Sequence, residues 1–301
     1  MNRLPVGQIV RAAYAFTFGE IGTVIGLTWI PTAINAVGSF LVFQNYSAAM
    51  ATDANGMPAM AGPQLALTFL YFFVAFLLMA MMAVAITRQA LGLRQGPVFA
   101  HVSLGSAEWR VFGGLFGLYL LLMLFIVIFV IVVVLAAVAG GMAAKGNPAA
   151  ALGVGVMVFV LGVAGFCALI YIFVRLSFLF VPSAVNDGEF GLTRSWELTK
   201  GNFWRIFAVG LAVLLPFFLV QGIAEYFILG PDYFAAFVAS LRDPVHAAQQ
   251  SAVEARIVQG RLPLLLGMGL ILGPIMQSLL FSPAAFAYRV LSGKALTESQ
   301  N

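Results

Sequence analysis

Residues 111–144 read VFGGLFGLYLLLMLFIVIFVIVVVLAAVAGGMAA and contain no Asp, Glu, Lys or Arg. A helix needs roughly 20 apolar residues to cross about 30 Å of hydrocarbon, so this stretch is long enough to span a bilayer. It lacks the alternation of polar and apolar residues that is typical of membrane barrel strands. Only helices and closed barrels satisfy every backbone hydrogen bond in lipid, so the stretch predicts a transmembrane helix.

The rest of the chain has the same character. Hydrophobic residues make up 62% of it and charged residues only 9%, whereas soluble domains carry roughly a quarter charged residues. We therefore predict an all-α, polytopic membrane helix bundle with about six transmembrane helices and additional interfacial helices. It forms a single transmembrane domain over residues 1–295, followed by a short cytoplasmic tail at 296–301. The expected span cores are 21–43, 65–87, 111–139, 152–174, 206–228 and 264–288.

The positions of the basic residues predict the orientation. With the N-terminus inside, Lys145, Arg242, Arg256 and Arg261 lie outside and the other 11 of the 15 basic residues lie inside. Positive charge is enriched in cytoplasmic loops, so both termini are expected in the cytoplasm of a multi-pass inner-membrane protein. The net charge of +4 then indicates contact with anionic lipid headgroups rather than with nucleic acid.

Two segments between spans are expected to be helical. An interfacial cytoplasmic helix is predicted at about 186–201, with Trp196 toward lipid and with Arg194 and Lys200 toward water and headgroups. The outer loop at about 231–261 is also expected to be helical. Within it, Asp243 and Pro244 predict the start of a separate helix that ends near Gly260.

Arginine and tryptophan recur where the expected spans meet the cytoplasm. Every even-numbered span ends at an arginine, and two odd-numbered spans begin just after a Trp-Arg pair, which is a weak internal repeat. The repeat suggests three hairpin-like units, formed by the second and third spans, by the fourth and fifth, and by the sixth and first. The alternative is that Arg and Trp simply mark the interface, as they do in most membrane proteins. In either case we expect these residues to anchor the protein in the lipid interface. The residues expected to anchor the protein in the interface are Arg88, Trp109, Arg110, Arg175, Arg194, Trp196, Lys200, Trp204, Arg205 and Arg289.

The segment from Arg175 to Arg205 carries a family resemblance. After Arg175-Leu176 come Pro182, an acidic turn, the run SWELTKGN at 195–202, and Trp204-Arg205. This resembles the membrane domain found in some bacterial glycerophosphodiester phosphodiesterases and in the free-standing YciC group of inner-membrane proteins. The resemblance implies a multi-pass fold and an inner-membrane location in a bacterium.

The resemblance implies no catalytic activity. In the fused relatives the chemistry belongs to a separate soluble barrel with a His-Arg-Gly motif, whereas here His101 precedes Val102 and His246 precedes Ala247. No metalloprotease His pair, phosphate-binding glycine loop or serine nucleophile turn occurs either. We expect a protein that is not an enzyme and that has no catalytic, cofactor-binding or metal-binding residues.

Polar residues inside or beside the spans are the remaining candidates: Glu20, Gln221, Glu225 and Gln277, with Asn35 as a further polar position. A charged residue in hydrocarbon costs at least about 2.5 kcal/mol, so each is a candidate functional position. The simpler interpretation places the two glutamates at headgroup level and lets the amides hydrogen-bond between helices.

Three functions remain open. The first is a non-catalytic membrane component that organises lipids or protein partners, including further copies of itself, and it is favoured by the interfacial cytoplasmic segment. The second is a transporter or channel for a small solute, which Pro216, Gly222 and Pro274 favour because they interrupt spans. A lipid-modifying enzyme is the least favoured of the three.

Overall fold

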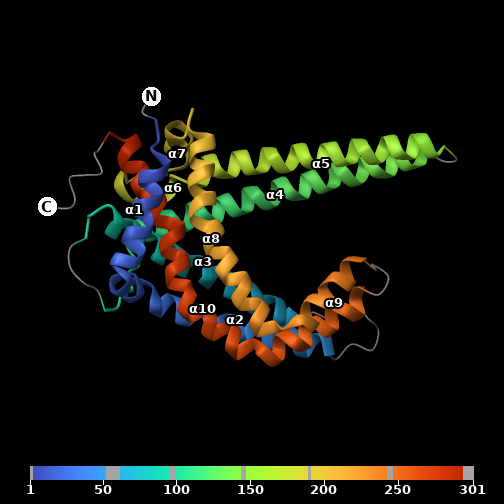
Figure 1. Cartoon of the computed structure of the whole chain (residues 1–301), viewed down its shortest axis with the longest axis horizontal. Helices are drawn as coiled ribbons and strands as arrows, with labels where there is room; N and C mark the ends of the chain where they lie inside the picture. Colours follow the sequence, from blue (N-terminus) through green and yellow to red (C-terminus); the bar gives the residue numbers. More distant parts are fainter. Residues whose placement is uncertain are drawn as a thin grey trace.

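The computed structural model of the chain describes residues 3–51, 62–94, 99–143, 147–188, 191–242 and 247–293 (Figure 1). Within these residues every regular element is a helix, which confirms the all-α prediction. The helices are α1 (Val6–Gly19), α2 (Ile21–Ala51), α3 (Gly62–Ala90), α4 (Ser106–Ala143), α5 (Pro148–Ser177), α6 (Phe180–Asn186), α7 (Leu192–Leu198), α8 (Phe203–Leu229), α9 (Pro231–Arg242) and α10 (Ala247–Leu291).

Six of the described helices are long and apolar enough to cross a membrane, namely α2, α3, α4, α5, α8 and α10. Each contains one of the six expected span cores, so the six-span prediction is confirmed and the chain is a multi-pass membrane protein. The expected tail at 296–301 and Lys145 lie outside the described residues.

Helix α1 was not expected from the sequence. Its buried residues Ile9, Ala13 and Phe16 recur at spacings of four and three, which places them on one face of the helix. That face packs against α8 and α10. The chain then turns at Glu20 and enters α2. The first span is therefore preceded by a packed helix rather than by a simple flank.

The main core lies at one end of the bundle. Buried residues from α1, α3, α6, α8 and α10 form one cluster there, including Ile9, Ile86, Phe180, Ile206 and Ala285. In Figure 1 this is the end at which α1, α6 and α7 gather with the start of α8 and the end of α10. The short helices α6 and α7 therefore lie at the end of the bundle that is expected, from the positions of the basic residues, to face the cytoplasm.

Helices α4 and α5 form a hairpin, here called the arm, that runs away from the other helices (Figure 1). None of the residues in their most apolar windows is buried. The seam between the two helices is nevertheless close, because Gly165 lies against the ring of Phe129 and Gly140 against Val154. Asn147 caps α5 by accepting from the backbone N–H groups of Ala149 and Ala150.

Two of the expected interfacial elements have different bounds. The helix predicted over 186–201 is limited to α7, and a second short helix, α6, precedes it with Pro182 inside. Proline is tolerated there because it sits in the first turn, where no intrahelical N–H bond is lost. The outer segment contains α9, but the helix expected to end near Gly260 continues through Gly260 and Pro263 as part of α10.

The weak repeat describes two of the three helix pairs that it implied. Helix α3 packs against α4, and α10 packs extensively against α2, as the units of the second with the third span and of the sixth with the first require. The unit of the fourth and fifth spans is not formed, because α5 packs mainly along α4 and its contact with α8 is limited.

Candidate functional site

The root of the arm is held by a cluster that we call the Arg175 joint, made of Tyr171, Arg175, Ser195, Trp196 and Thr199. Arg175 lies in the last turn of α5 and is buried. Its Nε donates to Thr199 Oγ1 at 3.3 Å, one terminal nitrogen donates to Tyr171 OH at 3.1 Å, and the other donates to the carbonyl of Trp196. The planar fork of an arginine suits three partners in different directions.

Aromatic rings complete the joint. The guanidinium carbon of Arg175 lies 3.7 Å from the centre of the Trp196 ring, and Tyr171 meets that ring edge-on. A cation over an aromatic face is attracted by the ring quadrupole. The ring of Trp196 therefore covers the buried charge, while part of the same side chain stays exposed.

Ser195 fastens α7 to the end of α5. Its hydroxyl donates to the carbonyl of Arg175 at 2.9 Å and accepts from the backbone N–H of Leu179 at 3.2 Å. Both backbone groups belong to the region where α5 ends and α6 begins, and such groups lack intrahelical partners. Ser195 is wholly buried, so these bonds are shielded from solvent.

A ring-against-glycine contact fixes the arm from its other helix. The fully buried Phe180 of α6 places its ring tip directly against Gly114 of α4. A side chain at residue 114 would occupy the space that the ring fills. Helix α6 therefore connects to α4 through Phe180 and to α5 through the chain, so the arm leaves the bundle in a defined direction.

The N-terminal segment is hydrogen-bonded to two residues near the start of α8, Asn202 and Arg205. Asn202 Oδ1 accepts from the backbone N–H of Leu4 at 3.2 Å, and Arg205 donates to the carbonyl of Leu4 at 3.5 Å. Farther along, Tyr14 OH on α1 donates to the carbonyl of Val213 at 3.0 Å. The side chain of Leu4 is buried in the core, so this segment is part of the packed structure.

Arg88 and Glu108 form an ion pair whose carboxylate is buried and whose guanidinium is partly exposed. The distance from Arg88 to Glu108 Oε1 is 3.1 Å, and the carboxylate side chain is fully buried whereas 36% of the arginine side chain is exposed. The second oxygen of Glu108 accepts from the backbone N–H of Gly105 at 2.9 Å. Glu108 is the third residue of α4 and reaches back to the residue before the helix, as in a capping box.

A second pair occupies the loop between α3 and α4. Arg94 and the Nδ1 atom of His101 lie 3.0 Å apart. Burial lowers the pKa of His101, and the positive charge of Arg94 lowers this pKa further. The imidazole therefore acts as a hydrogen-bond acceptor for Arg94 in its neutral form.

The other residues expected at the interface are distributed more loosely. Trp109 and Trp204 are exposed at the starts of α4 and α8. Arg194 is exposed and lies 3.6 Å from Glu197. Lys200 is exposed. Arg110 has a buried Nε without a hydrogen-bond partner among the described residues. Arg289 is buried in the last turn of α10.

The polar residues inside the spans do not form one group. Glu20 accepts from Gln89 at 3.0 Å beside the end of α3, and Gln221 donates to Glu225 at 2.8 Å within α8. Gln277 on α10 has a buried Oε1 with no partner in the described part of the chain. The structure thus links Gln221 with Glu225, but records no contact of either with Glu20 or Gln277.

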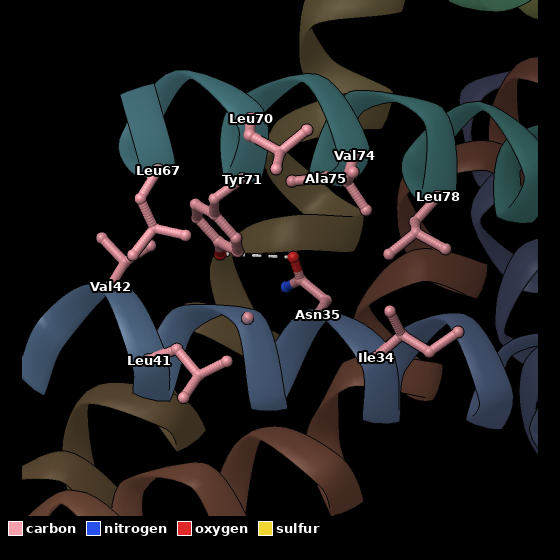
Figure 2. Close-up of a pocket in the computed structure, with 11 residues that line it drawn as sticks. Ile34, Asn35, Leu41, Val42, Leu67, Leu70, Tyr71, Val74, Ala75 and Leu78 are labelled. Carbon is pink, nitrogen blue, oxygen red and sulfur yellow. Dashed lines mark hydrogen bonds between the residues drawn. The ribbon is translucent and has the colours of Figure 1, made fainter. Parts of the chain in front are cut away.

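A half-open pocket with a volume of about 140 Å³ lies between helices α2 and α3 (Figure 2). Aliphatic side chains line most of it. The exception is a polar pair at its centre, where Tyr71 OH donates to Asn35 Oδ1 at 3.2 Å. Asn35 therefore hydrogen-bonds between helices, as the simpler interpretation predicted.

The residues of these contacts were more predictable from the sequence than their hydrogen-bond partners were. Glu108 was not singled out, although the spacing Gly105-x-x-Glu108 next to the start of a span is a signal for a capped helix. Tyr71 carries no comparable signal, because its pairing with Asn35 depends on how α2 and α3 align.

Within the described residues, no group of three or more His, Cys, Asp or Glu side chains is placed to hold a metal ion. The sites described above are hydrogen-bonded and packed contacts between helices. Comparison with protein-family models, with curated proteins and with solved structures finds no match for this chain.

Proposed function

We propose that this protein is a non-catalytic membrane component that organises lipids or protein partners through its α4–α5 arm. The observation that carries the proposal is that the arm leaves the bundle with no buried residue in its most apolar windows. An apolar surface of this length meets either lipid chains or another protein inside the bilayer.

Two features favour a contact element over a loosely attached hairpin. The glycine contacts at Gly140 and Gly165 bring the two helices of the arm close together. The Arg175 joint and the contact of Phe180 with Gly114 then fix its root. A rigid element loses less conformational entropy when it binds, so it presents a better surface for a specific neighbour.

The same proposal places the protein in the inner membrane of a bacterium, with both termini in the cytoplasm and with a relationship to the phosphodiesterase membrane domain and the YciC group. The distribution of basic residues and the SWELTKGN segment support it. A topology reporter fused at Met57 or Ala247 is expected outside the cytoplasm, and a cytoplasmic signal from both fusions would reverse the orientation.

Native mass spectrometry of the protein released from nanodiscs of phosphatidylethanolamine, phosphatidylglycerol and cardiolipin tests the arm directly. The wild type is expected to retain lipid in proportions that differ from the bulk bilayer, or to retain a defined protein partner. Truncating two exposed rings of the arm, Phe159→Ala and Phe166→Ala, should reduce that retention.

The matched control truncates two exposed rings of α3, Phe69→Ala and Phe72→Ala, and should leave retention unchanged. The proposal fails if the wild type retains neither lipid nor partner while a water-soluble solute binds, or if both double variants lose retention equally.

The alternative, a transporter or channel for a small solute, is favoured by one arrangement in the spans. Helix α8 contains Pro216 and then the half-buried pair Gln221 and Glu225, a combination of interrupted helix and polar side chains. Replacing Gln221, Glu225 or Gln277 should then change solute flux in reconstituted vesicles. Absence of flux for every tested solute, with the protein folded, would remove this alternative.

A further inference from the structure

The α2–α3 pocket holds hydrogen-bond donors that the fold does not use. Tyr71 is the only hydrogen-bond partner of Asn35 within the described part of the chain, and it donates to the amide oxygen. Both N–H bonds of Asn35 Nδ2 are therefore unpaired there. The neighbouring hydroxyl of Ser39 is already bound to the carbonyl of Ala36. Figure 2 shows Asn35 and Tyr71 pointing toward each other from the two helices.

The depth of Asn35 removes water as the ordinary partner. It lies 14 residues after the start of α2 at Ile21, which corresponds to about 21 Å along a helix. The membrane-spanning part of α2 runs from Ile21 to Asn45, so Asn35 is well inside the hydrocarbon layer. Lipid chains offer no acceptor at that depth, and a polar group left unpaired in hydrocarbon is unfavourable.

The shape of the pocket indicates what can pair with the amide. Ile34, Leu41 and Leu70 line it and are themselves exposed at the lipid-facing surface, so the pocket is reached from the bilayer. Gly38 provides the room for the ring of Tyr71, because a Cβ atom at residue 38 would lie 2.8 Å from that ring. The volume of about 140 Å³ is close to the roughly 150 Å³ of an apolar cavity that holds a benzene ring.

We propose that this pocket binds a membrane-dissolved molecule with a single six-membered ring and a carbonyl oxygen that accepts from Asn35 Nδ2. The aliphatic lining accommodates the ring, and the amide supplies the one polar contact that distinguishes this ligand from a hydrocarbon chain. Tyr71 positions the amide by holding its oxygen, so that the N–H bonds face the pocket. This site is separate from the arm and does not depend on the role proposed for it.

Fluorine NMR of the protein in nanodiscs tests the proposal with 4-fluoroacetophenone and with 1-ethyl-4-fluorobenzene, which has a similar shape but no carbonyl. Saturable binding of the ketone is expected to be at least tenfold tighter than that of the hydrocarbon. Asn35→Leu should reduce ketone binding to the hydrocarbon level, because the donor is lost while the pocket remains apolar. Val37→Leu, at an exposed position on the same helix, should leave both affinities unchanged.

Asn35→Leu alone leaves the Tyr71 hydroxyl without its acceptor, which could prevent folding. The double variant Asn35→Leu with Tyr71→Phe removes that hydroxyl as well and serves as the test if the single variant does not fold. It should bind the two probes equally. Equal binding of ketone and hydrocarbon to the wild type, absence of saturable binding, or full retention of ketone binding in the leucine variants would each overturn the proposal.

Discussion

The Arg175 joint provides the sharpest test of how the fold is held together, and the change to make is Arg175→Met. Methionine keeps an unbranched apolar chain of similar reach but loses the three hydrogen bonds to Thr199, Tyr171 and the Trp196 carbonyl. It also loses the charge that lies 3.7 Å from the Trp196 ring centre.

The size of the loss follows from these contacts. Side-chain hydrogen bonds between membrane helices contribute about 0.6 to 2 kcal/mol each, and a desolvated cation over an aromatic ring contributes about 2 kcal/mol. Removing the guanidinium also removes its desolvation cost, which offsets part of the sum. We expect Arg175→Met to lower the free energy of unfolding by about 3 kcal/mol.

The measurement is equilibrium unfolding in maltoside micelles with increasing dodecyl sulfate, followed by tryptophan fluorescence. Arg175→Lys keeps the charge but not the fork, so it should lie between the wild type and Arg175→Met. The control is Arg194→Gln in the same segment. Its pair with Glu197 is 3.6 Å long and more than half exposed on the carboxylate side, so removing it should change the free energy by less than about 0.5 kcal/mol. If Arg175→Met costs no more than Arg194→Gln, the guanidinium contacts do not hold the joint.

Two further predictions concern the core end of the bundle. Gly114→Leu should destabilise the protein by about 1–3 kcal/mol, because its side chain collides with Phe180; adding Phe180→Ala should restore part of the loss, and the absence of any restoration would contradict that contact. The pKa of His101 is lower in the folded protein than the ordinary value of 6.5 that applies to the unfolded chain. Stability should therefore be unaffected by this group above pH 6.5 and should fall as the pH drops below 6.5, because the unfolded chain takes up the proton first. NMR titration of His101 should give a midpoint below 6.5 that rises in Arg94→Ala, and an unchanged midpoint in that variant would exclude a role for the Arg94 charge.

The six spans were predictable because solvation by lipid depends on the local composition of the chain. Helix α10 shows where local rules fail, since a helix end was predicted near Gly260 but the helix continues through Gly260 and Pro263. In spans, neighbouring helices and local backbone adjustments can satisfy the groups that a proline frees. Helix α1 was missed for a related reason, because its apolar face is too short to be recognised as a span and is explained only by its packing on α8 and α10.

The candidate sites were predictable as residues but not as contacts. Arg175 and Trp196 were both expected at the interface, yet their stacking depends on α7 folding back against the end of α5. Ser195 fastens α7 to the end of α5. Apart from its position in the run SWELTKGN at 195–202, nothing in the sequence indicates that role. Likewise Asn35 was expected to bond between helices, while its partner Tyr71 follows from the alignment of two spans.

The length of the arm has a consequence for the bilayer itself. The uncharged part of α4 runs from residue 111 to 143 and that of α5 from 148 to 174, which correspond to about 50 Å and 40 Å of helix. The hydrocarbon layer is only about 30 Å thick, and membrane helices tilt by about 20° on average. To bury its apolar length the arm must tilt by roughly 40° or more, or the surrounding lipid must stretch. Either adjustment costs fractions of a kcal/mol per ångström of mismatch, so the arm makes the energy of this protein depend on membrane thickness.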